Sequence, residues 1–577
     1  MWHSENVPDN WHNSTLVQLF KGKGDRTVLD NFRHIHIKEE IPKLFGHLVM
    51  SASRDTLFKN MSKFQIGAKP GHRPQEHLFV LKSVVDLCMQ NDQTIFLSLF
   101  DISKFFDREN LRDCLNAVYK SGINGKLYRL LYEMNRNSRI SVQTPVGLSE
   151  KCDTGETVGQ GTLEGAVISA VSLDKGIEEF FEGSEYEVVY AGLRLQPLLF
   201  QDDVSRLAYT PNDLQAGNDM LECMAESKLL DFNLTKSGYM QIGKKRSDSS
   251  YQEQLNSHPI TLCGKPMPYV KEAKLLGDWL SDQGLSHSIA VTVRKRKGLA
   301  IASIYEIRTV VEDCRSNVVG GMSVGIDLWE STVLPMLLFN SETWMSMSQS
   351  TLNELEDIQK RFLRCLLAVG PGCPIPSLYW ETGVTVIKYR ILQKKLLFIH
   401  HLYTLPSSSL AKEVLNLQES LNLPGLIKEC NQVLKDNNLF QIDKYTKAQW
   451  KLSVKGLIMK LNEDELIAMS KKYKKIDFDT SSESKLRHSF LKDLKVHDAR
   501  MLFRIRSKMV QTIQMNFPSD KTFTANLWTC VACKAERDTQ SHVMRCEKYS
   551  MYREGLDLAY DLDCVKYFQK IVRIRTM

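Results

Sequence analysis

The chain has 577 residues, of which 43% are hydrophobic and 25% charged, with 75 lysines and arginines against 68 aspartates and glutamates. This length and apolar content can bury several cores, so we expect three or more structural units. No apolar run approaches the roughly 20 residues that span a bilayer, and the N-terminus lacks a charged-then-apolar signal pattern. These features argue against a membrane-spanning or exported protein, and the 13 scattered cysteines favour a reducing, intracellular compartment.

Two short apolar segments end in acidic side chains. Residues 94–101 end at Asp101, and residues 198–204 contain the pair Asp202 and Asp203. Both segments are rich in β-branched and aromatic residues, so each is predicted to form a buried strand. Three carboxylates in apolar surroundings repel one another unless cations neutralise them, and a hard divalent metal is the expected partner. Two such metals about 4 Å apart serve in-line phosphoryl displacement, whereas a chance acidic pair in a solvated turn has no such chemistry.

Positive charge is concentrated locally, although its overall excess is mild. The densest basic groups lie at residues 243–246, 294–297 and 471–475. Each group either contacts nucleic acid or forms a solvated face. Farther along, apolar residues recur at helical spacing from 352 to 366, which predicts a mostly helical region, and this helix is stopped by the glycines and prolines at 370–376.

The C-terminal part of the chain contains a metal-ligand pattern. Cys530 and Cys533 are spaced for one knuckle turn, and His542 and Cys546 share a helix face at i,i+4. Three thiolates and one imidazole close a tetrahedral zinc site with no open position, so the role of this site would be structural. The alternative is that these are ordinary buried cysteines beside a chance histidine.

Seven further segments follow one another in a defined order. They lie at residues 16–35, 65–73, 100–107, 159–162 (Gly-Gln-Gly-Thr), 200–203 (Phe-Gln-Asp-Asp), 230–237 and 273–277. In this order they resemble the reverse transcriptases of non-LTR retrotransposons. The chain departs from that family at Gln201, where a small residue is usual, and at His34, where a proline is usual. We therefore expect a divergent member of the family.

The resemblance implies a two-metal nucleotidyl transfer from a deoxynucleoside triphosphate to a primer 3′-OH. It implies that two Mg²⁺ are held by Asp101, Asp202 and Asp203, with Asp203 orienting more than ligating. It also implies a set of substrate-binding residues: Lys21, Arg33 and Lys236 at the triphosphate, Phe106 against the sugar 2′-OH, and Gln160 and Gly161 lining the nucleotide and template pocket.

The fold implied by the resemblance is α+β, in the form of a right-hand polymerase whose palm contains an antiparallel sheet. A mostly helical C-terminal region and a small zinc knuckle would follow it. The expected boundaries are 1–92 for partial fingers, 93–245 for the palm with its catalytic motifs, 246–345 for the primer-grip hairpin and thumb, 346–515 for the helical region and 516–577 for the zinc knuckle.

The resemblance also implies the partners: an RNA template, a DNA primer or target DNA, and deoxynucleoside triphosphates, with no membrane. The protein would act as a ribonucleoprotein in nucleus and cytoplasm. Only 31 residues follow Cys546, so we expect no endonuclease domain. Two alternatives remain open: a catalytically inactive nucleic-acid-binding remnant truncated inside the fingers, which the intact acidic residues argue against, and an RNA-directed RNA polymerase, which Phe106 argues against.

Overall fold

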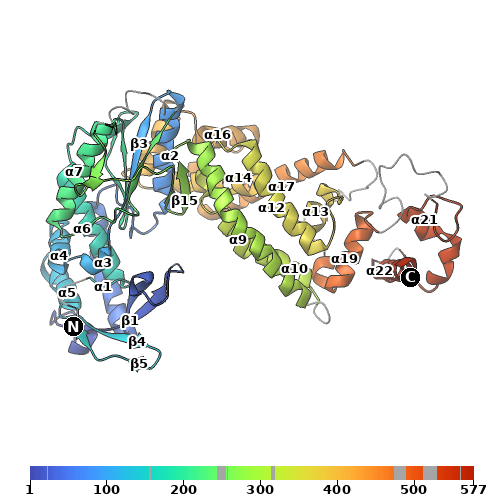
Figure 1. The fold of residues 1–577 in the computed structure, drawn as a ribbon, viewed down its shortest axis with the longest axis horizontal. Coiled ribbons are helices and arrows are strands. Elements are labelled where there is room, and N and C mark those ends of the chain that lie inside the picture. The colour runs from blue at the N-terminus through green and yellow to red at the C-terminus, as the bar shows by residue number, and fades with distance from the viewer. Residues whose placement is uncertain are drawn as a thin grey trace. The chain divides into compact units, whose positions relative to one another are not determined.

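Helices and strands are mixed along the chain, so the predicted α+β class is confirmed. The computed structural model describes residues 1–22, 24–154, 158–243, 255–256, 258–313, 319–473, 489–510, 529–558 and 561–576. The chain divides into two units, the first comprising Met1–Ser288 and His401–Gln432, the second comprising Ile289–His400 and Val433–Met577 (Figure 1). Among the described residues, no helix combines the length and apolar character needed to cross a membrane.

A four-stranded antiparallel sheet forms the centre of the first unit. Its strand order is β11 (Gly238–Ile242), β3 (Ile95–Asp101), β10 (Asp203–Ala208) and β9 (Leu198–Phe200). Strand β3 lies between two partners and its first six residues are buried, which explains its nearly continuous apolar sequence. Helices α6 (Leu163–Phe181) and α7 (Pro211–Ser227) share a hydrophobic core with this sheet.

The strand predicted over residues 198–204 is instead a hairpin. Strand β9 ends at Phe200, the chain reverses at Gln201 and Asp202, and β10 begins at Asp203 and continues to Ala208. The two polar residues interrupt the apolar run, and a two-residue connection is the shortest that joins antiparallel strands. The prediction of one strand there was wrong, whereas a strand over residues 95–101 is present as expected.

A second sheet of the first unit contains the N-terminal segment. Its strand order is β2-β1-β4-β5, with β6 paired to β4. The bounds are Asn13–Phe20 for β1, Phe32–Ile37 for β2, Arg139–Thr144 for β4, Gly147–Leu148 for β5 and Cys152–Asp153 for β6. Strands β1 and β2 are antiparallel, so the ends of this hairpin place Lys21 and Arg33 near one another.

Helices and short hairpins complete the first unit. Helix α2 (Pro74–Gln90) is nearly all buried, and α15 (Leu410–Ser420), distant in sequence, packs against it. The buried ammonium of Lys82 on α2 pairs with Asp278 at 2.6 Å, which ties α2 to the hairpin of β14 (Glu272–Leu275) and β15 (Asp278–Ser281). The remaining elements include α1 (Glu40–Asn60), α3 (Phe105–Arg108), α4 (Leu111–Lys120), α5 (Gly125–Asn135), β7 (Val188–Tyr190), β8 (Leu193–Leu195), β12 (Thr261–Leu262) and β13 (Lys265–Pro266).

The second unit is built mainly of helices around one hydrophobic core. Helix α12 (Gln349–Leu367) includes the predicted helical stretch; its apolar side chains at the expected spacing are buried from Leu355 to Leu366, and Leu352 is half-buried. The other main helices are α10 (Gly321–Leu328), α13 (Ile375–Thr382), α17 (Lys447–Ser470), α19 (Val496–Arg506), α21 (Gln540–Arg545) and α22 (Asp561–Thr576). Three more helices, α9 (Leu285–Asp313), α14 (Ile387–Thr404) and α16 (Leu426–Asp436), belong partly to each unit.

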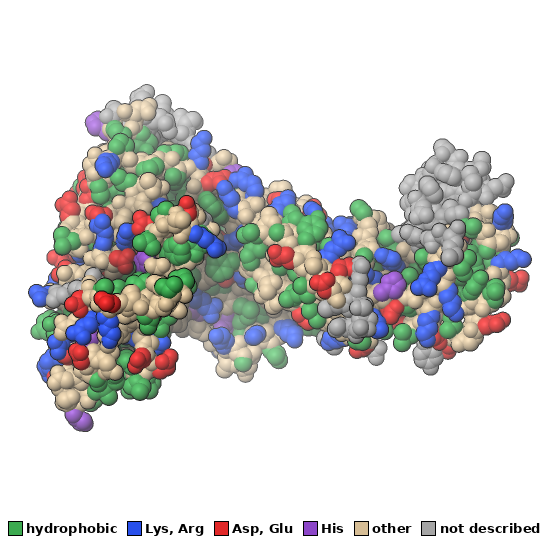
Figure 2. Space-filling view, turned by 60° about the horizontal axis from the view of Figure 1, so that its bottom comes forward, with side chains coloured by type: hydrophobic (Ala, Val, Ile, Leu, Met, Phe, Trp, Pro, Cys, Tyr) green, Lys and Arg blue, Asp and Glu red, His purple; other side chains and the backbone are tan. Residues whose placement is uncertain are grey.

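Charged side chains of both signs are interspersed with apolar and uncharged ones on the face shown in Figure 2. This distribution agrees with the small net charge of +7. Of the three basic groups that the sequence shows, residues 294–297 lie on α9. Residues 244–246 and 474–475, which belong to the other two groups, lie outside the described residues.

Candidate active site and metal centre

Asp101 and Asp203 lie directly opposite each other on neighbouring antiparallel strands. Strand register pairs the last residue of β3 with the first residue of β10. Cβ atoms of directly opposed residues in such a pair are about 4.5–5.5 Å apart, close enough for two carboxylates to share a cation. Asp202 precedes Asp203 in the connecting turn, so all three acidic side chains gather at one end of the sheet.

Burial and, to a smaller extent, mutual repulsion raise the pKa values of Asp202 and Asp203. Desolvation raises the pKa of Asp203 to about 6, with further contributions from the charges of Asp202 and Asp101. Desolvation also raises the pKa of Asp202, and Asp101 adds to this effect, whereas Lys236 and Arg33 oppose it. Like charges held together in a partly desolvated site favour binding of a cation. Carboxylate oxygens are ligands that suit Mg²⁺. Among the described residues, however, only the cysteine cluster brings three or more ligand atoms within 4.8 Å of one another, so the three carboxylates do not meet that criterion.

Lys236 is the nearest positively charged side chain to the acidic cluster. Its ammonium lies 3.0 Å from Asp101 Oδ2, and both side chains are partly exposed. The segment that contains Lys236 runs beside the end of β3: the Asn233 N–H donates to Asp101 O at 2.8 Å, and the Asp101 N–H donates to Ser237 Oγ at 3.1 Å. The sequence predicted that Lys236 faces a triphosphate, and the structure places it against Asp101.

The turn that carries Asp202 is held by Gln65, a residue that the sequence analysis did not single out. Gln65 is fully buried. Its Nε2 donates to Gln201 O at 3.2 Å, and its Oε1 accepts from the Gln201 N–H at 3.2 Å and from the Gly67 N–H at 2.8 Å. Gln65 also forms a bridge with Leu199, so this segment lies along the free edge of β9. Gln65 lies in the predicted segment 65–73, but only the fold shows what it contacts.

Gln201 itself has a strained backbone, with φ of +58°. Such a conformation costs a non-glycine residue free energy, so it persists only where its surroundings hold it. When the Gln201 side-chain amide is oriented with its nitrogen toward Ala166, that nitrogen donates to Ala166 O at 3.2 Å. In the same orientation, the side-chain oxygen accepts from the Ala68 N–H at 3.0 Å. The side chain that departs from the family pattern therefore anchors the turn rather than pointing freely into the site.

The Gln160-Gly161 pair lies against strand β2. The His36 N–H donates to Gln160 O at 2.8 Å, and a Cβ on Gly161 would lie 2.8 Å from Ile35 Cγ2. Gly161 also has a φ of +102°, which favours glycine. The sequence predicted that Gly161 makes room for a base pair. In the structure the neighbour that comes close to Gly161 is β2, the strand that also carries Arg33.

The remaining predicted substrate-binding residues are distributed around this site. Arg33 is exposed on β2, and its charge acts on the Asp202 carboxyl. The Lys21 ammonium donates to Asp30 O at 2.8 Å, so it contacts its own loop rather than the acidic cluster. Phe106 is half-buried on α3 after Asp101, with its ring centroid 5.4 Å from that of Phe105.

The four predicted zinc ligands converge in the second unit. One ligand atom from each of Cys530, Cys533, His542 and Cys546 lies within 4.8 Å of the other three. Cys533 Sγ is 3.3 Å from His542 Nε2. Tetrahedral zinc with bonds of about 2.0–2.3 Å places its ligand atoms roughly 3.5 Å apart, so modest contraction would complete the site. The donor set therefore fits a structural zinc ion.

Neighbouring groups orient this cluster. Glu536 Oε2 lies 3.0 Å from His542 Nδ1, the second-sphere carboxylate contact that fixes the tautomer of a metal-binding histidine. The backbone N–H groups of Ala535 and Glu536 lower the pKa of the Cys533 thiol to about 6. A lowered thiol pKa favours the thiolate that zinc requires.

The chain has distant likenesses among solved structures, and no protein-family model matches it. The chain is similar to apo telomerase from Candida tropicalis at 10% identity and a TM-score of 0.37, over 77% of this chain and 69% of that one. It is similar to telomerase from Candida albicans, in complex with a TWJ fragment of telomeric RNA, at 12% identity and a TM-score of 0.36, over 77% and 67%.

A third telomerase structure, from Candida tropicalis and truncated from its C-terminal domain, matches at 11% identity and a TM-score of 0.33, over 48% of this chain. The chain spans about half the length of that protein, 54%. With TM-scores below 0.5, none of these likenesses bears on the chemistry of this chain.

Close packing at Gly67 gives a test of how the acidic turn is held. A Cβ at this position would lie 2.2 Å from Gln201 N and 2.8 Å from Gln65 Oε1. Gly67→Ala should therefore displace the turn and destabilise the first unit by about 1–3 kcal/mol, the usual cost of overpacking. Chemical denaturation measures this loss, and hydrogen exchange should show increased opening in residues 199–208.

Gly456→Ala is the matched control, because nothing lies within 4 Å of a Cβ on this residue of α17. It should leave stability unchanged or raise it by up to about 1 kcal/mol. Equal stability of Gly67→Ala and the parent would contradict the packing described for the turn.

The cysteine cluster predicts one zinc ion per chain. Cys533→Ser should lower the zinc content and increase hydrogen exchange across residues 529–558, because a serine hydroxyl is a poor zinc ligand. Elemental analysis measures the zinc, and Cys223→Ser, at an exposed cysteine outside the cluster, should keep the parental content. If the purified parent protein contains no zinc even after it has been refolded in the presence of zinc, the proposed zinc site is wrong.

Proposed function

We propose that the chain is an RNA-directed DNA polymerase of the non-LTR retrotransposon type. The observation that carries this proposal is the gathering of Asp101, Asp202 and Asp203 at one end of an antiparallel sheet, with raised pKa values at the last two. The carboxylate at the end of β3 and the two carboxylates of the β9–β10 hairpin would form a donor set for two Mg²⁺ ions, which would activate the primer hydroxyl and stabilise the leaving pyrophosphate.

The chain's own residues would bind and orient the substrates around this cluster. Arg33 offers a planar fork for the triphosphate, and its charge already acts on Asp202. Lys236 has a side chain that is 62% exposed, so it is free to leave Asp101 and turn toward an anionic substrate. Lys21, exposed beyond β1, would supply a third positive charge from the same hairpin as Arg33.

Selection of sugar and template is assigned to neighbouring positions. Phe106 follows Asp101 by five residues on α3, where its half-buried ring would exclude a ribose 2′-OH. Gln160 and Gly161, held against β2, would line the pocket for the nucleotide and the template base. In this proposal RNA is the template, DNA the primer and a deoxynucleoside triphosphate the substrate.

The hand-like arrangement is part of the same proposal. Residues 1–92 would act as fingers, 93–245 as palm and 246–345 as primer grip and thumb. The β14–β15 hairpin, fixed by the Lys82–Asp278 ion pair, would grip the primer. The protein would act inside the cell as a ribonucleoprotein, in nucleus and cytoplasm.

Primer extension on an RNA template with Mg²⁺ tests the proposal directly. The parent should extend a DNA primer with deoxynucleotides, and Asp202→Asn should lower the rate on the order of a hundredfold or more, because a neutral amide is a poor substitute for a charged metal ligand. Asp55→Asn, at an exposed position of α1, is the matched control and should retain parental activity.

The outcomes separate the alternatives. A folded parent that binds RNA but extends no primer would favour the inactive remnant. Incorporation of ribonucleotides as readily as deoxynucleotides would favour an RNA polymerase and remove the role assigned to Phe106. Equal activity of Asp202→Asn and the parent would overturn the two-metal assignment.

A further inference from the structure

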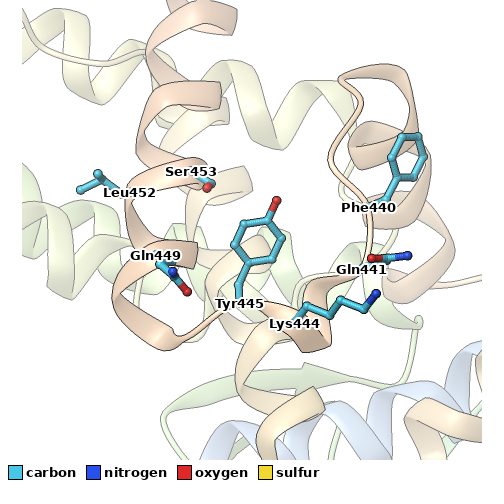
Figure 3. Close-up of a pocket in the computed structure, with 7 residues that line it drawn as sticks. All are labelled: Phe440, Gln441, Lys444, Tyr445, Gln449, Leu452 and Ser453. Carbon is cyan, nitrogen blue, oxygen red and sulfur yellow. The ribbon is translucent and has the colours of Figure 1, made fainter.

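A groove in the second unit lies between α17 and the loop that precedes it. It encloses about 650 Å³ and is lined by Phe440, Gln441, Lys444, Tyr445, Gln449, Leu452 and Ser453. Figure 3 shows the Tyr445 ring rising between the helix that carries Gln449 and Ser453 and the loop that carries Phe440. None of these residues belongs to the acidic cluster or to the cysteine cluster.

Buried neighbours hold Tyr445, which lines the groove. Trp450 is fully buried and donates its Nε1–H to Leu396 O at 2.9 Å. The Tyr445 ring meets Trp450 edge-on at 5.4 Å, and the His400 ring stacks on Trp450 at 5.8 Å with an interplanar angle of 16°. His400 Nε2 also lies 2.8 Å from Tyr445 O, so both the ring and the backbone of Tyr445 are fixed before any ligand binds.

The wall of the groove presents an aromatic ring to solvent. Phe440 is 55% exposed, although Ile442, two residues later, is buried. Asn438 and Gln441 on either side of Phe440 have positive φ angles of +57° and +60°. Asparagine adopts this conformation readily, whereas Gln441 retains it only where its surroundings hold it.

One lysine lies beside the aromatic pair: Lys444 lines the groove. Lys447, Lys451 and Lys455 are exposed at i,i+4 spacing on another face of α17 from the one that carries Gln449 and Ser453, and Lys455 lines a different pocket. Like charges at this spacing destabilise a helix slightly. Within the part of the chain that the structure describes, none of these four lysines forms an ion pair. The exposed Asp443 is the acidic residue nearest to them in the sequence.

We propose that this groove binds single-stranded nucleic acid, with an unpaired base stacked on Phe440 and Tyr445 and a phosphate held by Lys444. Every base offers a π-face, so stacking on exposed aromatic rings beside positive charge binds single strands with little sequence preference. An acidic peptide would use Lys444 but would leave the exposed ring without a planar partner. The proposal rests on the proposed function for its role, since a polymerase that copies RNA must hold single strands outside its active site.

The test uses the full chain and a fluorescent, unstructured adenosine-rich oligonucleotide of about 12 nucleotides, in RNA and DNA forms. Phe440→Ala should weaken binding at least about fivefold, and Phe440→Trp should keep it, because an indole also stacks. Lys444→Gln should lower the slope of log affinity against log salt by about 0.7. Tighter binding of the RNA form than of the DNA form identifies RNA as the ligand, and the reverse order identifies DNA.

Two control variants share the chemistry but lie on α22, outside the groove. Leu562→Ala removes an apolar side chain that is 49% exposed, and Lys570→Gln removes one exposed positive charge. Both should bind the oligonucleotide like the parent. A Phe440→Ala affinity within twofold of the parent, or equal losses in the controls, would overturn the proposal. Phe440-dependent binding of a fluorescent polyglutamate peptide, without oligonucleotide binding, would assign the groove to an acidic protein instead.

The binding assay is independent of polymerase activity. Extension of a pre-annealed primer by Phe440→Ala should match that of the parent, because the variant leaves the acidic cluster intact. If the chain extends no primer but binds the oligonucleotide through Phe440, the proposed function is wrong and the groove proposal stands. If the chain is an active polymerase whose oligonucleotide binding does not depend on Phe440, the proposed function stands and the groove proposal is wrong.

Discussion

Repulsion among three carboxylates is the constraint on which the rest of the first unit depends. Strand register places Asp101 opposite Asp203, and the shortest possible connection places Asp202 beside them. A protein gains no stability from this arrangement, since desolvation and like charge raise the pKa of Asp203 to about 6. Lys236 relieves part of the repulsion through Asp101. In the function proposed above, a divalent cation would neutralise the repulsion that remains.

Holding such a cluster requires a rigid support, and the first unit provides it by burial and by hydrogen bonds. Strand β3 runs through the core, so Asp101 cannot move away without disturbing the sheet. Gln65 holds both backbone groups of Gln201, and Gly67 leaves no space for the turn to shift toward it. The same principle appears in the second unit, where Glu536 orients His542 in the cysteine cluster and buried Trp450 fixes Tyr445 in the groove. Preorganised side chains reduce the cost of ordering a site when its ligand arrives.

Local sequence predicts the features that depend on neighbours in the chain. The strand ending in Asp101, the helix α12 and the convergence of Cys530, Cys533, His542 and Cys546 all follow from short-range spacing, and the structure contains all three. Local sequence did not predict the features that depend on contacts between distant residues. It predicts one strand where the structure has a hairpin at residues 201–202, because periodicity does not show where a chain reverses. The contact between Gln65 and Gln201 joins residues 136 positions apart, and the packing of α15 on α2 joins segments more than 300 residues apart, so neither has a local signal.

The most direct test of the central claim is the number and spacing of divalent ions at the acidic cluster. Electron paramagnetic resonance of Mn²⁺, with the protein bound to a chain-terminated primer on an RNA template and the matching deoxynucleoside triphosphate, reports both. Two spin-coupled ions at a separation of about 4 Å are expected, and Asp101→Asn should abolish the coupling. A single uncoupled ion in the parent, or coupling that survives in Asp101→Asn, would contradict the account of three carboxylates holding two metals.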